Sequence, residues 1–424
     1  MFKSENIKPR FFYGWVIVAC CFVAIFMATS SRYCFSIFMK PLSENYGFSR
    51  AQLGGAMSLN NILYALLSPV VGILLDRIGA RIILLIGGVL MGLGLWLFAS
   101  TQSLFGLYLT FGTLTGAGLA FTYFVPTFSL TRKWFQQKAG LASGIVAFGS
   151  GLGLAVIAPV TNYLVQDFSW QTGARIIGIS TWILVVPLAV LFIRNSPESI
   201  GLHPDGINRE GNPPPAPDPH PPLSELLPLF FSRNFILLFI FYFAWSLAVC
   251  GVLTHFFLWG TKDLKLDGGL VALALSLATL SASGSRLLGG WLSDRWGRLP
   301  FIALALFGLA LAMILGIYTR SRAEFYGFAV IFGIAYGLPL AVFPVFVGDL
   351  FGRRLTGSLY GGLIMAGGLA GGLGAWGFGF AFDRLGSYHP VYLITSAFCL
   401  FALLLMIFFR RGQSLPPPAG KSIC

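Results

Sequence analysis

Long apolar runs alternate with short polar segments along almost the whole chain. Twelve runs are long enough to cross a hydrocarbon layer of about 30 Å, because a helix rises about 1.5 Å per residue. The pattern therefore predicts an all-α membrane protein with twelve transmembrane helices. The expected spans are residues 12–40, 52–75, 82–101, 105–130, 139–166, 173–193, 233–260, 269–293, 300–319, 325–350, 356–382 and 391–409.

One long segment does not fit this pattern. Residues 195–226 are polar and rich in proline, and we expect them neither to span a membrane nor to pack a core. They predict a cytoplasmic linker loop between an N-terminal six-helix bundle, residues 1–194, and a C-terminal six-helix bundle, residues 227–424.

The two halves repeat a short motif. Gly72-Ile-Leu-Leu-Asp76-Arg77-Ile-Gly79-Ala-Arg81 follows the second run, and a similar turn, with Asp294 and Arg295 at a shift of 218 residues, follows the eighth. Internal repeats of this kind predict two pseudo-symmetric bundles that rock against each other around a site near the middle of the membrane.

Composition and charge agree with a membrane protein. Hydrophobic residues make up 56% of the chain and charged residues only 10%, whereas about a quarter of the residues of soluble domains are charged. Of the 28 lysines and arginines, 18 lie at the termini or in the even-numbered loops and eight in the odd-numbered loops. This bias predicts that both termini are cytoplasmic. The net charge of +13 is thus a topology signal, and we expect no nucleic-acid partner.

Several kinds of chemistry have no sequence signal. The chain has no nucleotide-binding loop and no nucleophile elbow, and its six cysteines are scattered. We therefore expect no enzymatic activity, no metal site and no cofactor.

The repeated Gly-x-x-x-Asp-Arg-x-Gly-x-Arg turn, the six-plus-six pattern and the long central loop resemble the major facilitator superfamily. Further passages resemble bacterial monocarboxylate transporters related to oxalate/formate antiporters: Gly14-Trp15, Trp134-Phe135 through Gly149, and Pro197-Glu198 through Pro204. The resemblance implies a monomeric protein surrounded by lipid in a bacterial inner (plasma) membrane. It also implies a secondary transporter that moves a small monocarboxylate, of the lactate or pyruvate type, by alternating access and in symport with a proton.

One full charge lies deep inside the eighth run. Arg286 precedes Asp294 by eight residues, which puts it roughly 12 Å inside the membrane boundary. A guanidinium there costs about 2.5 to 3.5 kcal/mol and stays protonated. All fifteen acidic residues fall in loops or near the ends of runs, so water or a bound anion remains as its partner. In the resembling family an arginine at this position holds the substrate carboxylate, and we expect the same of Arg286.

Other residues are candidates for the substrate cavity. Tyrosine offers a flat apolar wall and a hydroxyl group, although ordinary helix packing is an alternative for any single aromatic residue. Arg32, eight residues before Lys40, either draws anions into the outer part of the cavity or reaches out to the outer surface. The candidate lining residues are Tyr33, Asn60, Tyr123, Tyr336 and Phe343.

Charged residues near the repeated turns are candidates for a cytoplasmic latch that breaks and re-forms during rocking. The alternative is that these charges only anchor loops at the membrane interface. The latch residues we expect are Asp76, Arg77, Arg81, Asp294, Arg295 and Asp349.

The proton carrier and the type of coupling stay open. Mammalian members of the resembling family carry an Asp four residues before the arginine and a Lys in the first helix, but here these positions are Ala282 and Tyr33. A fixed cation disfavours return of the empty carrier, so either one carboxylate exchanges for another or the carboxylate moves with a proton. One interior cation suits a monoanion. The alternatives are an oxalate/formate-type exchanger and a nutrient sensor built on a transporter fold.

Overall fold

The computed structural model describes residues 12–48, 50–206 and 223–409. The described chain is helical, and no strand occurs within these ranges. The N-terminal half consists of α1 (Gly14–Tyr33), α2 (Phe35–Tyr46), α3 (Arg50–Ile78), α4 (Ala80–Phe98), α5 (Leu104–Leu107), η1 (Tyr108–Thr115), α6 (Gly116–Thr122), α7 (Phe124–Trp134), α8 (Ala139–Asp167) and α9 (Trp170–Leu191).

The linker and the C-terminal half follow the same plan. Two short turns, η2 (Glu198–Ile200) and η3 (Pro204–Gly206), come after α9. The remaining elements are α10 (Leu223–Phe230), α11 (Arg233–Leu258), η4 (Trp259–Asp263), α12 (Gly268–Trp296), α13 (Leu299–Tyr318), α14 (Arg322–Phe351), η5 (Arg353–Leu355), α15 (Thr356–Leu385), α16 (His389–Leu405) and η6 (Met406–Phe408).

The prediction of twelve spans is confirmed. Twelve helical stretches are long and apolar enough to cross a membrane, from Gly14–Met39 to His389–Phe408. Large apolar side chains on their outer faces are exposed, among them Ile183, Ile394 and Leu404. Exposure of such residues over the sides of the molecule is expected where acyl chains, and not water, surround the protein.

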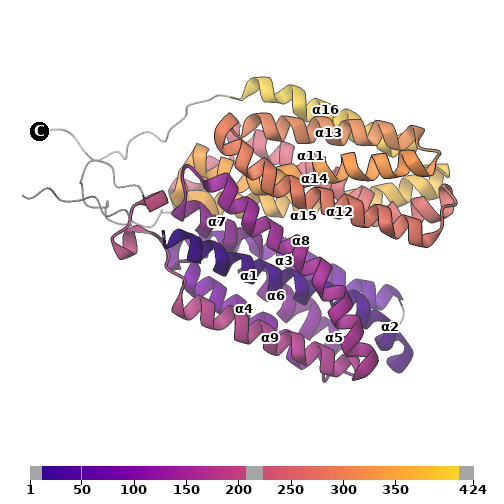
Figure 1. Cartoon of the computed structure of the whole chain (residues 1–424), viewed down its shortest axis with the longest axis horizontal. Helices are drawn as coiled ribbons and strands as arrows, with labels where there is room; N and C mark the ends of the chain where they lie inside the picture. Colours follow the sequence, from indigo (N-terminus) through magenta and orange to yellow (C-terminus); the bar gives the residue numbers. More distant parts are fainter. Residues whose placement is uncertain (1–11, 49, 207–222, 410–424) are drawn as a thin grey trace, which may run out of the picture.

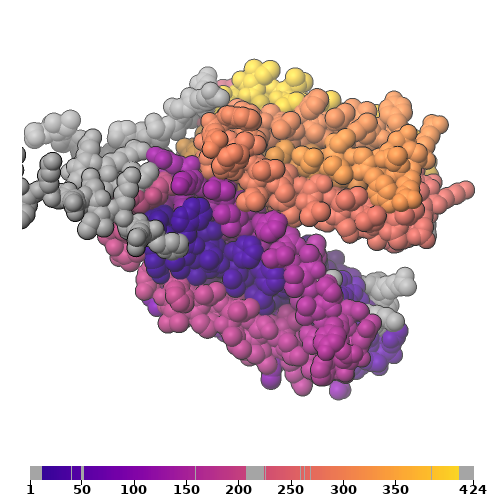
Figure 2. Space-filling view, viewed as in Figure 1, coloured from indigo at the N-terminus to yellow at the C-terminus, as the bar shows by residue number. Residues whose placement is uncertain are grey.

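The two halves form separate helix bundles that meet at one end of the molecule. At this end α1 begins and α16 ends, and we call it the terminal end (Figure 1). Toward the opposite, far end the bundles diverge, and Figure 2 shows a wedge-shaped gap between them. The structure is therefore closed at the terminal end and open at the far end.

Glycines allow the bundles to touch through their backbones. Across the interface α3 packs on α15 and α8 packs on α12. A β-carbon on Gly72 would collide with the backbone of Gly357, and one on Gly140 would collide with the carbonyl of Gly290. Close helix approach of this kind requires small residues.

The fourth span is interrupted where sequence reasoning expected a continuous helix. Tyr123, at φ −83° and ψ −129°, separates α6 from α7. Pro126 follows three residues later and has no N–H group to donate to the preceding turn, which accounts for a break at this point. Its repeat counterpart, Pro344, lies inside the continuous helix α14.

Part of the predicted linker is folded, contrary to expectation. Leu202 packs against the hydrophobic core, and Asp205 accepts hydrogen bonds from the backbone N–H groups of Gln136 and Gln137 at 2.9 and 2.8 Å. Leu226 of α10 is buried. Residues 207–222 lie outside the described residues, and the predicted boundaries 195–226 stay a prediction.

Candidate functional site

Arg286 lies in α12 on the face that packs against α8 of the other bundle. Only 4% of the surface of Arg286 is exposed. A β-carbon on Gly144 of α8 would lie 2.9 Å from the Arg286 carbonyl, and one on Gly151 would lie 3.7 Å from its Nη1. The side chain therefore sits between the two bundles and does not point toward lipid.

Two hydroxyl groups, one from each bundle, accept hydrogen bonds from this guanidinium. Nη1 of Arg286 donates to Ser150 Oγ of α8 at 2.9 Å, and Nη2 donates to the hydroxyl of Tyr336 in α14. The guanidinium carbon also lies 5.0 Å from the centroid of the Tyr336 ring. Arg286 thus connects the two halves directly through Ser150.

No acidic side chain among the described residues forms an ion pair with Arg286. Its Nε is buried and has no hydrogen-bond partner. A buried guanidinium that keeps its charge and an unused donor is suited to a bidentate interaction with a carboxylate.

Both hydroxyl partners are held in place by their own surroundings. Ser150 Oγ donates to the Ala147 carbonyl at 2.8 Å. The rings of Phe332 and Trp245 flank Tyr336. The indole N–H of Trp245 also donates a hydrogen bond to the backbone carbonyl of Tyr336 at 3.1 Å. The site around Arg286 is therefore preorganised by packing as well as by hydrogen bonds.

Arg32 is a second half-buried cation without an ion pair in the described part of the chain. Its Nη2 donates to Asn61 Oδ1, and its guanidinium carbon lies 5.5 Å from the ring centroid of Tyr33 and 5.7 Å from that of Tyr64. Its Nε is buried without a partner. This geometry places Arg32 among tyrosines of the N-terminal bundle.

Tyr123 belongs to the cluster of tyrosines around Arg32. It stacks on Phe124 at 3.9 Å and meets Tyr64 edge-on at 5.7 Å. Of the predicted lining residues, the structure brings Tyr336 to Arg286 and Tyr33 to Arg32, while Tyr123 contacts Tyr64, whose ring also faces Arg32.

Two predicted lining residues are packed inside their own bundles. Asn60 is fully buried, and its Nδ2 donates to the Phe111 carbonyl at 3.0 Å. Phe343 is 0% exposed and contacts Tyr242 and Trp245 edge-on. The structure does not place either residue against Arg286, because each lies on the face of its helix that fills the bundle core.

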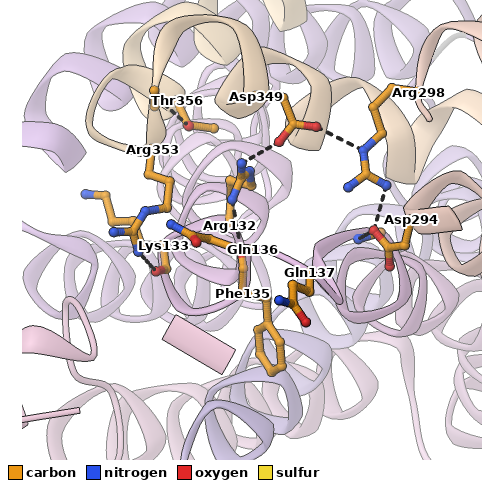
Figure 3. Close-up of polar contacts among 12 residues, drawn as sticks. Arg132, Lys133, Phe135, Gln136, Gln137, Asp294, Arg298, Asp349, Arg353 and Thr356 are labelled. Carbon is orange, nitrogen blue, oxygen red and sulfur yellow. Dashed lines mark hydrogen bonds and ion pairs between the residues drawn. The ribbon is translucent and has the colours of Figure 1, made fainter. Parts of the chain in front are cut away.

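Acidic residues close the terminal end by capping helices of the opposite bundle. Asp294 of α12 accepts hydrogen bonds from the N–H groups of Gly140 and Leu141 at 2.7 and 2.9 Å, in the first turn of α8. Arg298 pairs with the same carboxylate at 2.6 Å (Figure 3). A carboxylate at a helix N-terminus is favoured by the free N–H groups and by the helix dipole.

Asp76 makes the equivalent contact in the other direction. It accepts hydrogen bonds from the N–H group and the hydroxyl of Ser358 at 2.7 and 2.8 Å, in the first turn of α15. Lys133 Nζ lies 3.6 Å from its other oxygen. The two repeated acids therefore form a reciprocal pair of caps.

Asp349 joins three elements at the same end of the molecule. It pairs with Arg132 of α7 and, at 3.0 Å, with Arg298 (Figure 3). Nearby, Arg353 donates to the Lys133 carbonyl at 2.7 Å and pairs with Glu198 of the linker at 3.2 Å. The contacts of Asp349 with Arg132 and of Arg353 with Lys133 and Glu198 cross between the halves, as the caps do, whereas the Asp349–Arg298 pair lies within the C-terminal bundle.

Three predicted latch arginines are directed elsewhere. Arg77 is exposed, Arg81 donates to the Val190 carbonyl at 2.7 Å, and Arg295 lies over the Trp291 ring at 4.2 Å. The cations that meet the acids are instead Arg132, Lys133 and Arg298. Arg298 belongs to the second copy of the motif, whereas Arg132 and Lys133 come from α7, outside both copies, so motif spacing could not identify them.

No metal centre is formed within the described residues, where no group of three or more His, Cys, Asp or Glu side chains comes together. The site is thus built from guanidinium, hydroxyl and aromatic groups.

Comparison with known proteins identifies related chains. The sequence profile of the Major Facilitator Superfamily matches residues 21–375 and 261–422. Monocarboxylate transporter 11 of Mus musculus is 29% identical over 92% of this chain and 85% of its own, and the oxalate:formate antiporter of Oxalobacter formigenes is 25% identical over 94% and 92%. Human monocarboxylate transporter 12 is 33% identical over 166 residues, which are 39% of this chain and 32% of that one.

The fold also resembles solved structures. The proton:xylose symporter XylE superposes with a TM-score of 0.75 at 15% identity, over 94% of this chain and 96% of that one. At this identity the similarity concerns the fold alone.

Proposed function

Because the chain belongs to the Major Facilitator Superfamily, we propose that it is a secondary active transporter of a small monocarboxylate of the lactate or pyruvate type. The observation that carries the proposal is Arg286, a buried cation between the bundles with a free Nε and no ion pair among the described residues. A substrate carboxylate supplies the missing anion.

The hydroxyl groups beside Arg286 give the site its selectivity in this proposal. Ser150 and Tyr336 already bond to the guanidinium, and each oxygen can also contact a polar group next to the carboxylate. A 2-hydroxy or 2-oxo group occupies this position, and the rings of Tyr336 and Trp245 cover the apolar part of the substrate.

Transport proceeds by alternating access. Substrate enters through the wedge at the far end, and the caps at the terminal end then release while the far end closes. Arg286 forms hydrogen bonds with Ser150 of one bundle and Tyr336 of the other. A substrate bound to Arg286 therefore lies where movement of the bundles changes the contacts of the substrate. The 18-to-8 distribution of basic residues supports a cytoplasmic terminal end, in an inner membrane of the bacterial type.

Proton symport is the coupling mode that we propose. Without a bound anion, Arg286 carries an uncompensated charge through the closed intermediate, which is costly in a medium of low dielectric constant. The carboxylate pairs with Arg286 on the way in, and a proton that moves with it makes the transported charge zero. The empty carrier then returns with the guanidinium solvated by the hydroxyl groups of Ser150 and Tyr336.

A specific observation favours carboxylate exchange as a second candidate. Arg32 adds another half-buried cation without an ion pair in the described part of the chain, and a full-length relative is named an oxalate:formate antiporter. Two interior cations disfavour return of the empty carrier more strongly than one. In an exchanger, the carrier returns with an outgoing carboxylate bound, so the cations are compensated in both directions.

Uptake of labelled lactate into proteoliposomes distinguishes the two modes. Symport predicts uptake into empty vesicles that an inward proton gradient stimulates and an uncoupler abolishes. Exchange predicts uptake that requires internal carboxylate and ignores the gradient. Vesicles containing Arg286→Gln protein are the control. If no labelled lactate, pyruvate, formate or oxalate enters above this control, the proposed substrate class is wrong.

A further inference from the structure

A pocket lies at the terminal end of the N-terminal bundle, away from the Arg286 site. It has a volume of about 520 Å³, within the roughly 300–1,000 Å³ that is usual for small-ligand sites. It forms where the chain leaving α9 lies against the turn between α3 and α4. Its lining consists of Arg81, Val190, Leu191, Ile193, Arg194, Asn195, Ser199 and Ile200.

The walls of this pocket are held by specific contacts. Asn195 Oδ1 accepts a hydrogen bond from the Arg81 N–H group at 3.1 Å, and the Asn195 amide occupies the space that a β-carbon on Gly79 would need. Gly79 has φ +87°, which also favours glycine. The indole N–H of Trp134 donates to the Arg194 carbonyl at 3.1 Å. The pocket is therefore a preformed part of the fold.

Two guanidiniums line the pocket without an acidic partner in the described ranges. Arg81 donates to the Val190 carbonyl at 2.7 Å, and Arg194 makes a 3.5 Å contact with the Ile193 carbonyl. No ion pair to either residue occurs among the described salt bridges. Guanidinium groups have five donors each, so both retain capacity for a phosphate oxygen.

The position of the pocket relates it to the membrane surface. Arg81 is the second residue of α4, and Leu191 is the last residue of α9, so the pocket lies where two membrane spans end. Leu191 and Ile200 in its lining are 60% and 40% exposed, and Ile82 beside it is 46% exposed. Cations beside exposed apolar side chains at this depth match a phosphate headgroup above acyl chains.

The repeat provides an internal comparison. A second pocket, of about 440 Å³, lies at the equivalent place in the C-terminal half and includes Arg295, Arg298 and Phe409. Phe409 corresponds to Leu191 at the shift of 218 residues. In this second pocket, however, Arg298 is neutralised by Asp294 and Asp349. Among the described salt bridges the second pocket therefore keeps one unpaired cation, Arg295, whereas the N-terminal pocket keeps two, Arg81 and Arg194.

We propose that the pocket between α4 and the segment after α9 binds the phosphate headgroup of an anionic phospholipid, through Arg81 and Arg194. The segment after α9 contacts both bundles. Asn195 holds the turn between α3 and α4, next to Asp76, and Glu198 pairs with Arg353 of the C-terminal bundle. A bound headgroup therefore stabilises this segment, which contacts both bundles at the closed terminal end.

Native mass spectrometry of the full-length protein in detergent tests this proposal. The probes are phosphatidylglycerol and phosphatidylcholine with identical acyl chains. We expect wild-type protein to retain phosphatidylglycerol in preference to phosphatidylcholine, and Arg81→Gln/Arg194→Gln to lower that retention about tenfold. The matched control, Arg320→Gln/Arg322→Gln, removes two charges at the far end and should retain phosphatidylglycerol like wild type.

Several outcomes would overturn the proposal. Equal phosphatidylglycerol retention by wild type and by the double variant would do so, as would equal retention of the two lipids by wild type. Full displacement by glycerol 3-phosphate would assign the pocket to a soluble phosphate compound instead. If the double variant fails to fold, Arg194→Gln alone replaces it, because the 3.5 Å contact of this side chain contributes little to the fold.

Discussion

Arg286 combines burial, a fixed charge and a free donor in one side chain. Its hydrogen bonds go to neutral hydroxyl groups, which solvate a cation but do not neutralise it. The charge is therefore available to an anion that enters between the bundles. Lysine could supply the charge but not the two parallel N–H donors that match a carboxylate.

At this position we predict that Arg286→Lys reduces the kcat/KM of lactate uptake by about 100-fold, because a bidentate charge-assisted contact is worth roughly 3 kcal/mol. Initial rates in proteoliposomes measure the effect. Arg322→Lys, at the far end over Tyr326, is the matched control and should transport normally. Unchanged kinetics for Arg286→Lys would remove this residue from the binding site.

Tyr336→Phe separates the hydroxyl from the ring. The ring contacts with Phe332 and Trp245 stay, whereas the hydrogen bond to Arg286 is lost. We expect an increase in KM of about tenfold, since a hydrogen bond between a neutral hydroxyl group and a charged group contributes roughly 1.5 kcal/mol. The melting temperature should change little. A large fall in melting temperature without a change in KM would show that the hydroxyl serves the fold alone.

For Arg286, the inventory of charges in the sequence was enough to predict that no acidic side chain of the described residues pairs with it, while its role in substrate binding stays a prediction. With every acid near the end of a span, its lack of an acidic partner followed without coordinates. The same reasoning could not find Ser150, since serines are common in membrane helices and its meeting with Arg286 depends on which faces of α8 and α12 touch. Asn60 and Phe343 show the same limit: in uniformly apolar helices, periodicity does not distinguish the bundle core from the cavity.

Among the helices, those that join the two bundles at the terminal end approach each other closely through glycines. Gly140 of α8 lies against Gly290 of α12, and Gly72 of α3 lies against Gly357 of α15. Each pair includes a backbone carbonyl that would block an added methyl group and cannot rotate away. The closed terminal end thus depends on these positions having no side chain.

Gly140→Ala should weaken closure of the terminal end. The new β-carbon meets the Gly290 carbonyl only when the bundles are together, so the variant should shift the population toward a terminal-open state. Increased labelling of a cysteine introduced at Ser293, in the buried terminal interface, would report this shift. Gly284→Ala in α12, where a β-carbon has no neighbour within 4 Å, is the control. Equal labelling of both variants would contradict the prediction.

The helices themselves were the easiest elements to predict, because a span must contain about twenty apolar residues. The break at Tyr123 was missed, although Pro126 was visible in the sequence. Pro344 at the equivalent place in α14 causes no break, so proline alone does not decide where a membrane helix is interrupted. Neighbouring helices determine whether the freed backbone groups find partners.

For the molecule as a whole, several ion pairs together, and not one latch, hold the terminal end closed. Asp349 pairs with Arg132 of the other bundle and with Arg298 of its own, and Arg353 reaches both the N-terminal bundle and the linker. Partly buried pairs that share one carboxylate are coupled, so removing that carboxylate affects all of them.

Asp349→Asn should therefore favour closure of the far end. Double electron–electron resonance between spin labels at Gln102 and Arg320, in a background with the native cysteines replaced, measures the separation of the far ends of the two bundles. We expect a larger population at short distances in Asp349→Asn, because loss of the ion pairs releases the terminal end. An unchanged distribution would mean that the helix caps alone hold the closed state.

The internal repeat was sufficient to predict the two-bundle architecture, and the comparison with known families agrees with it. It did not predict the partners of the repeated acids. Asp294 pairs with Arg298 of its own motif, but Asp76 and Asp294 also cap helices of the opposite bundle. Backbone N–H groups carry no sequence signature, which explains why this arrangement became visible only in three dimensions.

The reciprocal caps have a consequence for how the terminal end opens. The hydrogen bonds between two carboxylates and the amide groups of the opposite bundle break in the same movement, and the freed amide groups and carboxylate oxygens then need water. Opening is consequently a wetting event, and its rate should depend on the activity of water as well as on the substrate. Osmotic stress on the terminal side would hold the carrier shut.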